Sequence, residues 1–148
     1  MDYNIIKRIL FNSIILAILC NYCLYSQDCS DGFIYIENIP GNVNNINNNN
    51  NCFFNNDLDV LNDLISLNNL YNYNSALELG PQIWVTGRIT SLVATYIQGG
   101  SNGITQKIDL LPDNFGQVDS LAYLAIDKHN LAALPESFTQ LSSLSFLK

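Results

Sequence analysis

The chain has 148 residues, enough for one domain, and carries a formal net charge of −7 with 13% charged residues. Its six Lys and Arg residues form no cluster. Because nucleic acids and anionic membranes are bound through basic patches, this composition argues against both as partners. The negative charge is expected to keep the protein soluble, and the alternative is that it attracts a basic partner.

Residues 1–26 have the pattern of a secretory signal peptide. Lys7 and Arg8 form the positive start, Ile9 to Leu19 is the apolar run, and Ser26 is a small residue at the expected cleavage point. A retained membrane anchor is the alternative, although a span needs about 20 apolar residues. We therefore expect a secreted or cell-surface protein. Membrane attachment would require an uncleaved N-terminal segment or a missing C-terminal anchor.

The chain holds four cysteines, and cleavage after Ser26 would remove Cys20 and Cys23. The remaining pair, Cys29 and Cys52, predicts one disulfide in an exported protein. It would close a loop of about 24 residues and stabilise the fold by about 3–4 kcal/mol in the chain-entropy model. A metal site is the alternative, but two thiols without a nearby His supply too few ligands. We expect no metal and no cofactor.

Residues 27–56 are expected to form an N-terminal disulfide loop. Phe33 to Glu37 is rich in aromatic and β-branched residues, which predicts a short strand. Asn42 to Asn51 holds eight asparagines in ten positions and no apolar set that could pack. It is predicted to be a solvated loop, with a prion-like or binding role as the alternative.

Asp57 to Leu67 has the clearest helical pattern, with Asn56 or Asp57 as the expected N-terminal cap. The apolar residues that fall on one helical face are Leu58, Leu61, Leu64 and Ile65. The polar residues of this segment also suggest a calcium loop, but the glycine and the final glutamate of the EF-hand pattern are missing. Trp84, the only tryptophan, is expected in the core rather than in a ligand site.

The C-terminal residues 108–148 repeat themselves with an offset of 23 residues. Ile108 to Val118 aligns with Leu131 to Leu141, including a shared Leu-Pro pair and a shared Phe. A fixed period of this length indicates stacked repeats. The preceding stretch, which contains Gly99 to Gly103, breaks the spacing and is expected to be an irregular first repeat.

The spacing LxxLxIxxHxLxxLPxxFxxL from Leu121 to Leu141 resembles the leucine-rich repeat. The order of helix, Trp84 and Gly-Arg-Ile-Thr resembles the N-terminal cap of extracellular leucine-rich-repeat receptors and secreted bacterial leucine-rich-repeat proteins, without their usual cap cysteines. The resemblance, which covers Asp57 to Lys148, implies an α/β fold that is the start of a leucine-rich-repeat solenoid with an N-terminal helical cap. The disulfide loop precedes this cap, and because Leu147 and Lys148 fall inside a repeat, we expect the C-terminus to be incomplete. The expected parts of the chain are a signal peptide (1–26), the disulfide loop (27–56), the cap (57–92) and the repeats (93–148).

The resemblance also implies a binding surface on the concave face of the repeats. The side chains expected there are Tyr123, Ala125, Asp127, Lys128 and Phe146. Because aromatic residues are favoured as binding anchors, the implied function is extracellular recognition of a protein or peptide, or of a surface glycan. The alternative is a structural role, as a capping segment or a fragment of a larger leucine-rich-repeat surface protein or receptor.

His129 is the only histidine and stands where the family usually has Asn. A neutral imidazole can donate one backbone hydrogen bond and accept another, so we expect a structural role for it. No nucleophile elbow, zinc motif or phosphate loop occurs in the sequence. We therefore name no catalytic residue and predict that the protein is not an enzyme. The competing hypothesis is that it is an enzyme such as a secreted hydrolase.

Overall fold

The computed structural model describes residues 29–47, 50–100 and 102–148. The predicted signal peptide, with Cys20 and Cys23, lies outside these residues. Among the described residues, no helix combines the length and the apolarity needed to cross a bilayer.

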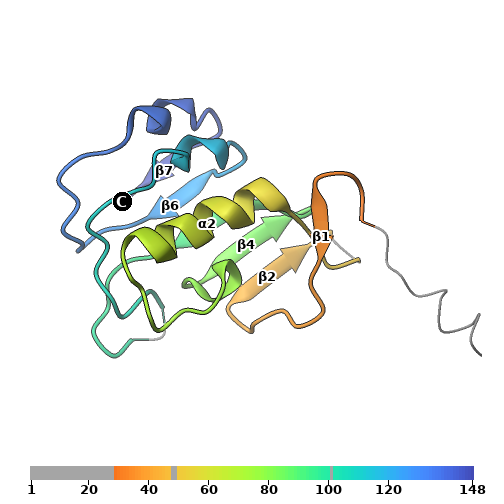
Figure 1. Ribbon diagram of the computed structural model, residues 1–148, viewed down its shortest axis with the longest axis horizontal. Coiled ribbons are helices and arrows are strands. Elements are labelled where there is room, and N and C mark those ends of the chain that lie inside the picture. The colour runs from red at the N-terminus through yellow and green to blue at the C-terminus, as the bar shows by residue number, and fades with distance from the viewer. Residues whose placement is uncertain (1–28, 48–49, 101) are drawn as a thin grey trace, which may run out of the picture.

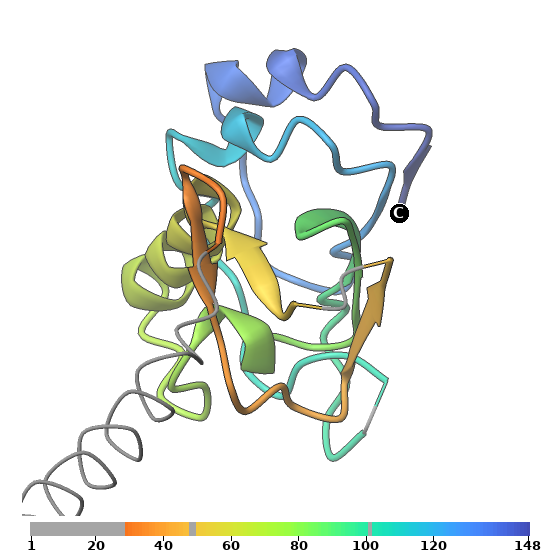
Figure 2. The same cartoon turned by 90° about the vertical axis from the view of Figure 1, so that its right-hand side faces the viewer.

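Five strands form the main sheet, and α2 (Asn55–Leu67) lies over one of its faces (Figure 1). The sheet has the spatial order β2 (Val43–Ile46), β4 (Gln82–Val85), β5 (Arg88–Val93), β6 (Tyr123–Ala125) and β7 (Phe146–Leu147). A separate two-stranded sheet pairs β1 (Phe33–Tyr35) antiparallel with β3 (Cys52–Phe54). Short 3₁₀ helices complete the fold, and these are η2 (Ala76–Glu78), η3 (Phe115–Gln117) and η4 (Glu136–Gln140). In the turned view of Figure 2, α2 lies on one side of the molecule and β2 and β7 lie on the other.

The prediction of a solenoid with a helical cap is wrong. In the described residues the protein is a small mixed α/β domain with one α-helix and two sheets, not an elongated leucine-rich-repeat solenoid. The sheet is mixed because β4 and β5 form an antiparallel hairpin between parallel neighbours. The helix joins the central core, because burying its apolar stripe against the sheet is more favourable than leaving it in water. That core includes Leu61, Leu64, Trp84, Ile89 and Leu92.

The helix itself is confirmed, and it begins two residues before the predicted start. Its predicted cap is wrong. Phe54 is the N-cap residue, and no side-chain cap hydrogen bond is present among the described atoms of this helix end. Strand β3 runs directly into the helix, and the amide of Asn55 donates to the carbonyl of Gly32 at 2.8 Å instead. Asp57 lies in the first turn, where its carboxylate is bound by β5.

The loop prediction for the asparagine-rich tract is wrong between Val43 and Ile46, which form β2. This strand pairs parallel with β4, with Val43 opposite Gln82 and Ile46 opposite Val85. Just before it, the Asn42 side chain donates to the carbonyls of Leu77 and Gly80. Backbone pairing with β4 therefore overrides the weak strand preference of asparagine.

The predicted disulfide is confirmed. It joins Cys29 to Cys52 with a Cα–Cα distance of 5.7 Å, at the start of β3. Strand β1 is confirmed in part, since it ends at Tyr35 and not at Glu37. A disulfide of this kind is typical of a protein that folds in an oxidising environment.

Trp84 is confirmed as a core residue, with 0% of its surface exposed. Its indole nitrogen donates to the side-chain oxygen of Gln82 at 2.8 Å, so its polar atom is satisfied inside the core. The ring of Phe53 meets it edge-on, with the centroids 5.1 Å apart.

The 23-residue repetition is visible in the structure as two units that lie side by side. We call residues 108–130 the first unit and residues 131–148 the second unit. Strands β6 and β7 pair in parallel with Tyr123 opposite Phe146. On the other side of the units, the rings of Phe115 and Phe138 stack with their centroids 6.0 Å apart. Residues aligned by the repeat therefore contact each other.

Candidate binding surface

The candidate site is the open face, which we define as the face of the five-stranded sheet opposite α2. Side chains alternate between the two faces of a strand, so the pairing register shows which residues share a face. One row crosses all five strands on the open face, and it consists of Asn44, Ile83, Ser91, Tyr123 and Phe146.

Large apolar side chains of the open face are exposed to solvent. The exposed fractions are 39% for Ile46, 36% for Ile83, 37% for Tyr123 and 43% for Phe146. Together they supply apolar surface along β2, β4, β6 and β7. A group of exposed apolar residues rimmed by polar ones is typical of an interaction site.

Tyr123 and Phe146 stack on each other. Their ring centroids are 4.3 Å apart and their planes differ by 3°. The short distance follows from the sheet, because parallel strands in register lie about 4.8 Å apart and hold equivalent side chains one above the other. The pair thus presents one broad, rigid aromatic surface.

A polar cluster lies just beyond the end of β6. Asp127 accepts a hydrogen bond from the Thr95 hydroxyl at 2.5 Å and lies 3.5 Å from the ammonium of Lys148. The Thr95 hydrogen bond, followed by the charge of Lys148, lowers the pKa of Asp127 below its usual value. The open face therefore ends in a fixed carboxylate beside a cation.

Of the predicted residues, the structure stacks Tyr123 on Phe146 and pairs Asp127 with Lys148. Lys128 is exposed in the turn after β6, where its carbonyl accepts a hydrogen bond from Lys107 at 2.7 Å. Ala125 is only 2% exposed, although it points to the predicted face. A methyl group between two paired strands is too short to reach past its larger neighbours, so Ala125 offers a partner almost no surface.

Sequence reasoning missed the contributions of Ile46, Ile83 and Thr95 to this surface. Ile46 was missed because its strand lies in the asparagine-rich tract. Ile83 follows the period-2 alternation around buried Trp84, and this signal was present in the sequence. Thr95 is brought to Asp127 only by the pairing of β5 with β6.

His129 is fully engaged by backbone groups, which agrees with the structural role predicted for it. Its Nδ1 accepts from the amide of Ile108 at 3.0 Å, and its Nε2 donates to the carbonyl of Ala94. Burial, aided by the charge of Lys107, lowers the pKa of His129 below its usual value. The neutral ring thus ties the start of the first unit to the residue that follows β5.

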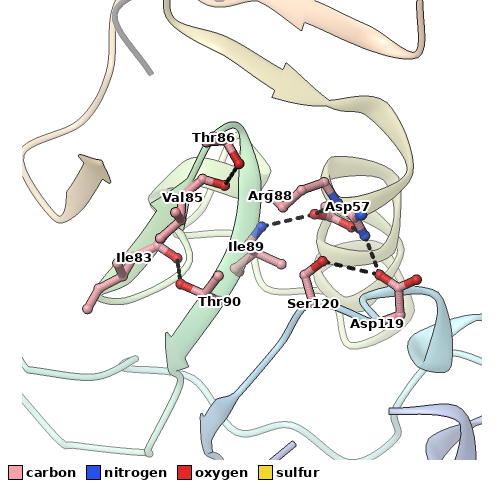
Figure 3. Close-up of polar contacts among 9 residues, drawn as sticks. All are labelled: Asp57, Ile83, Val85, Thr86, Arg88, Ile89, Thr90, Asp119 and Ser120. Atoms are coloured by element: carbon pink, nitrogen blue, oxygen red, sulfur yellow. Dashed lines mark hydrogen bonds and ion pairs between the residues drawn. The ribbon is translucent and has the colours of Figure 1, made fainter. Parts of the chain in front are cut away.

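An ion-pair cluster around buried Asp57 lies on the α2 side of the sheet (Figure 3). Asp57 is 0% exposed and accepts from Arg88 Nε at 2.8 Å and from the amide of Ile89 at 2.9 Å. Arg88 also donates to Asp119 in the first unit. Burial raises the pKa of Asp57, whereas the hydrogen bond to Asp57 raises the pKa of Arg88 and keeps it charged. Because these groups bind one another, the cluster holds the helix, the sheet and the first unit together.

A groove of about 780 Å³ lies between α2 and the loop that precedes η3. Its lining residues are Asp63, Ser66, Leu67, Leu110, Leu111, Pro112, Asp113 and Asn114. Within the described ranges, no group of three or more His, Cys, Asp or Glu side chains could hold a metal ion.

No protein-family model matches the chain, and no curated protein or solved structure matches it either. Membership of the leucine-rich-repeat family therefore stays a prediction that rests on the repeat spacing.

Proposed function

We propose that this protein is an extracellular recognition module that binds a protein or peptide on its open face. The observation that carries the proposal is the stacked pair of Tyr123 and Phe146, both more than one-third exposed. Preorganised aromatic rings lose little conformational entropy on binding, which is why such residues dominate the binding energy of many interfaces.

The surroundings of the pair support a polypeptide ligand. Ile46 and Ile83 offer further exposed apolar contacts on the same face, and Asp127 and Lys148 offer both signs of charge beyond the end of β6. A peptide presents these same elements, since it combines apolar side chains with charged and hydrogen-bonding groups.

The extracellular location is part of this proposal. It is supported by the Cys29–Cys52 disulfide, which needs an oxidising environment to persist. The signal-peptide pattern at residues 1–26 supports the same location.

The test is a selection of random peptides on the immobilised oxidised protein, followed by affinity measurements on the enriched sequences. Replacement of Tyr123 and Phe146 by Ala should weaken binding at least about tenfold each. Tyr71→Ala is the matched control, because Tyr71 is an 80% exposed tyrosine outside the sheet, and it should leave the affinity unchanged. If the enriched peptides bind a variant that carries both alanine substitutions as tightly as they bind the natural chain, the proposal is refuted.

A further inference from the structure

We propose that a second copy of this chain docks on the end of the second unit, so that two five-stranded sheets join across β7. We call this surface the end face. It consists of the free edge of β7 and the side chains of Leu131, Leu134, Phe138, Leu144 and Leu147. The inference is independent of the proposed function, which concerns the open face.

The first unit shows what this surface looks like when a neighbour covers it. Leu111 is 6% exposed and Leu124 is 0% exposed. Their equivalents, Leu134 and Leu147, are 48% and 49% exposed. In the described part of the chain nothing covers these two leucines as the second unit covers the first. Burying a leucine contributes about 1.5–3 kcal/mol, so the end face can supply binding energy.

The backbone of β7 is also ready to pair. The amides of Phe146 and Lys148 donate to the carbonyls of Ala122 and Leu124 on the β6 side. Successive residues of a strand direct their amides and carbonyls to opposite edges, so Leu147 directs its own toward the free edge. A free strand edge next to an apolar surface is a template for adding a strand from another chain.

The charge distribution favours a second copy of the same chain. The protein carries a net charge of −7, but the second unit has only Glu136 and Lys148 as charged residues. Two copies can therefore meet at the end face with little repulsion. Lys148 is held toward β6 by Asp127, at 3.5 Å, and so leaves the free edge less protected.

The contact is expected to be twofold, because the opposite edge of the sheet does not match the end face. Strand β2 and the residue after it expose Asn44, Ile46 and Asn47, and no leucine. A twofold axis beside β7 instead lets each end face meet its equivalent, which gives a closed dimer rather than a filament. The two β7 strands would then pair antiparallel, with Leu147 of each copy near the axis.

The experiment is sedimentation equilibrium on the full chain, expressed for export and purified oxidised, between about 1 and 200 µM. We expect twice the chain mass at the upper end, and a melting temperature that rises with concentration. Leu134→Glu and Leu147→Glu should each raise the dissociation constant of the dimer at least about a hundredfold, because each places two like charges in an apolar contact.

Leu110→Glu is the matched control. Leu110 is 53% exposed and lies beside α2, so this variant should dimerise like the natural chain. A natural chain that stays monomeric at the highest concentration would overturn the proposal. A dimer that survives both end-face substitutions would overturn it as well. Neither result bears on peptide binding at the open face, because Tyr123 is retained in every variant.

Discussion

The two units of the C-terminal half place the same repeat spacing in two environments. Apolar side chains of the first unit that are at most 6% exposed include Ile108, Leu111, Phe115, Leu121 and Leu124. Their equivalents in the second unit are half-buried or exposed. A further pair differs from these, because Leu141 is buried like its counterpart Val118, at 7% exposed against 1%.

The comparison separates the direction of a side chain from its burial. The repeat spacing gives equivalent side chains the same direction in both units, outward for the stacked pair of Tyr123 with Phe146 and toward the core for that of Phe115 with Phe138. Burial then depends on whether a further layer covers the unit. An identical leucine can therefore contribute several kilocalories in one unit and little in the other.

The largest effect is expected at Leu124. Leu124→Ala should lower the free energy of unfolding by about 2–5 kcal/mol, because it leaves a cavity in a closed core. Leu147→Ala, at the equivalent position, should cost less than about 1 kcal/mol in the monomer, because the side chain is half exposed. Urea unfolding at low protein concentration measures both values. Equal costs would show that the second unit is covered in solution.

A smaller effect is expected at Gly116. An added Cβ would lie 2.0 Å from the Ser137 carbonyl oxygen, so Gly116→Ala should push the second unit away and cost about 1–3 kcal/mol. The equivalent residue of the second unit is Thr139, which already has a side chain and is exposed. Thr139→Ala should therefore stay within about 0.5 kcal/mol of the natural chain in thermal unfolding. A tolerated alanine at position 116 would mean that the units are not held at the observed spacing.

His129 makes the junction between β5 and the first unit sensitive to pH. The fold needs a neutral ring, because Nδ1 accepts from Ile108, and burial lowers the pKa of His129. The unfolded chain therefore takes up the proton first as pH falls. Stability should be complete above about pH 6.5 and decline as pH is lowered through that value toward the depressed pKa of the folded state.

Urea midpoints at about pH 7.5 and pH 5.5 measure this decline. His129→Asn should be less stable at the higher pH but nearly insensitive to this interval, because the chain has no other histidine. If the variant shows the same slope, the decline comes from another group.

The smallest effect is expected at Asp119, whose equivalent in the second unit is Ser142. Asp119 is bound by Arg88, but its side chain is 59% exposed, and exposed ion pairs contribute about 0–1 kcal/mol. Asp119→Asn should lower the free energy of unfolding within that range, and the loss should shrink at high salt. A loss of several kilocalories would mean that Asp119 is needed to keep buried Asp57 and Arg88 paired.

The sequence alone determined the features that depend on local pattern and pair chemistry. The helix, the core position of Trp84, the Cys29–Cys52 disulfide and the hydrogen-bonding role of His129 could all be predicted, because each follows from spacing, composition or the valence of one side chain. The placement of Tyr123 and Phe146 on one face was also predicted, from the resemblance of the repeats.

Only the tertiary structure decided how these pieces are assembled. It placed α2 over the sheet rather than at the end of a solenoid, and it paired the asparagine-rich strand β2 with β4. It also buried Ala125 and brought Ile46 and Ile83 to the open face. The physical reason is that burial and strand pairing depend on residues far away in the chain. A local sequence pattern does not specify which distant segment will pack against it or pair with it.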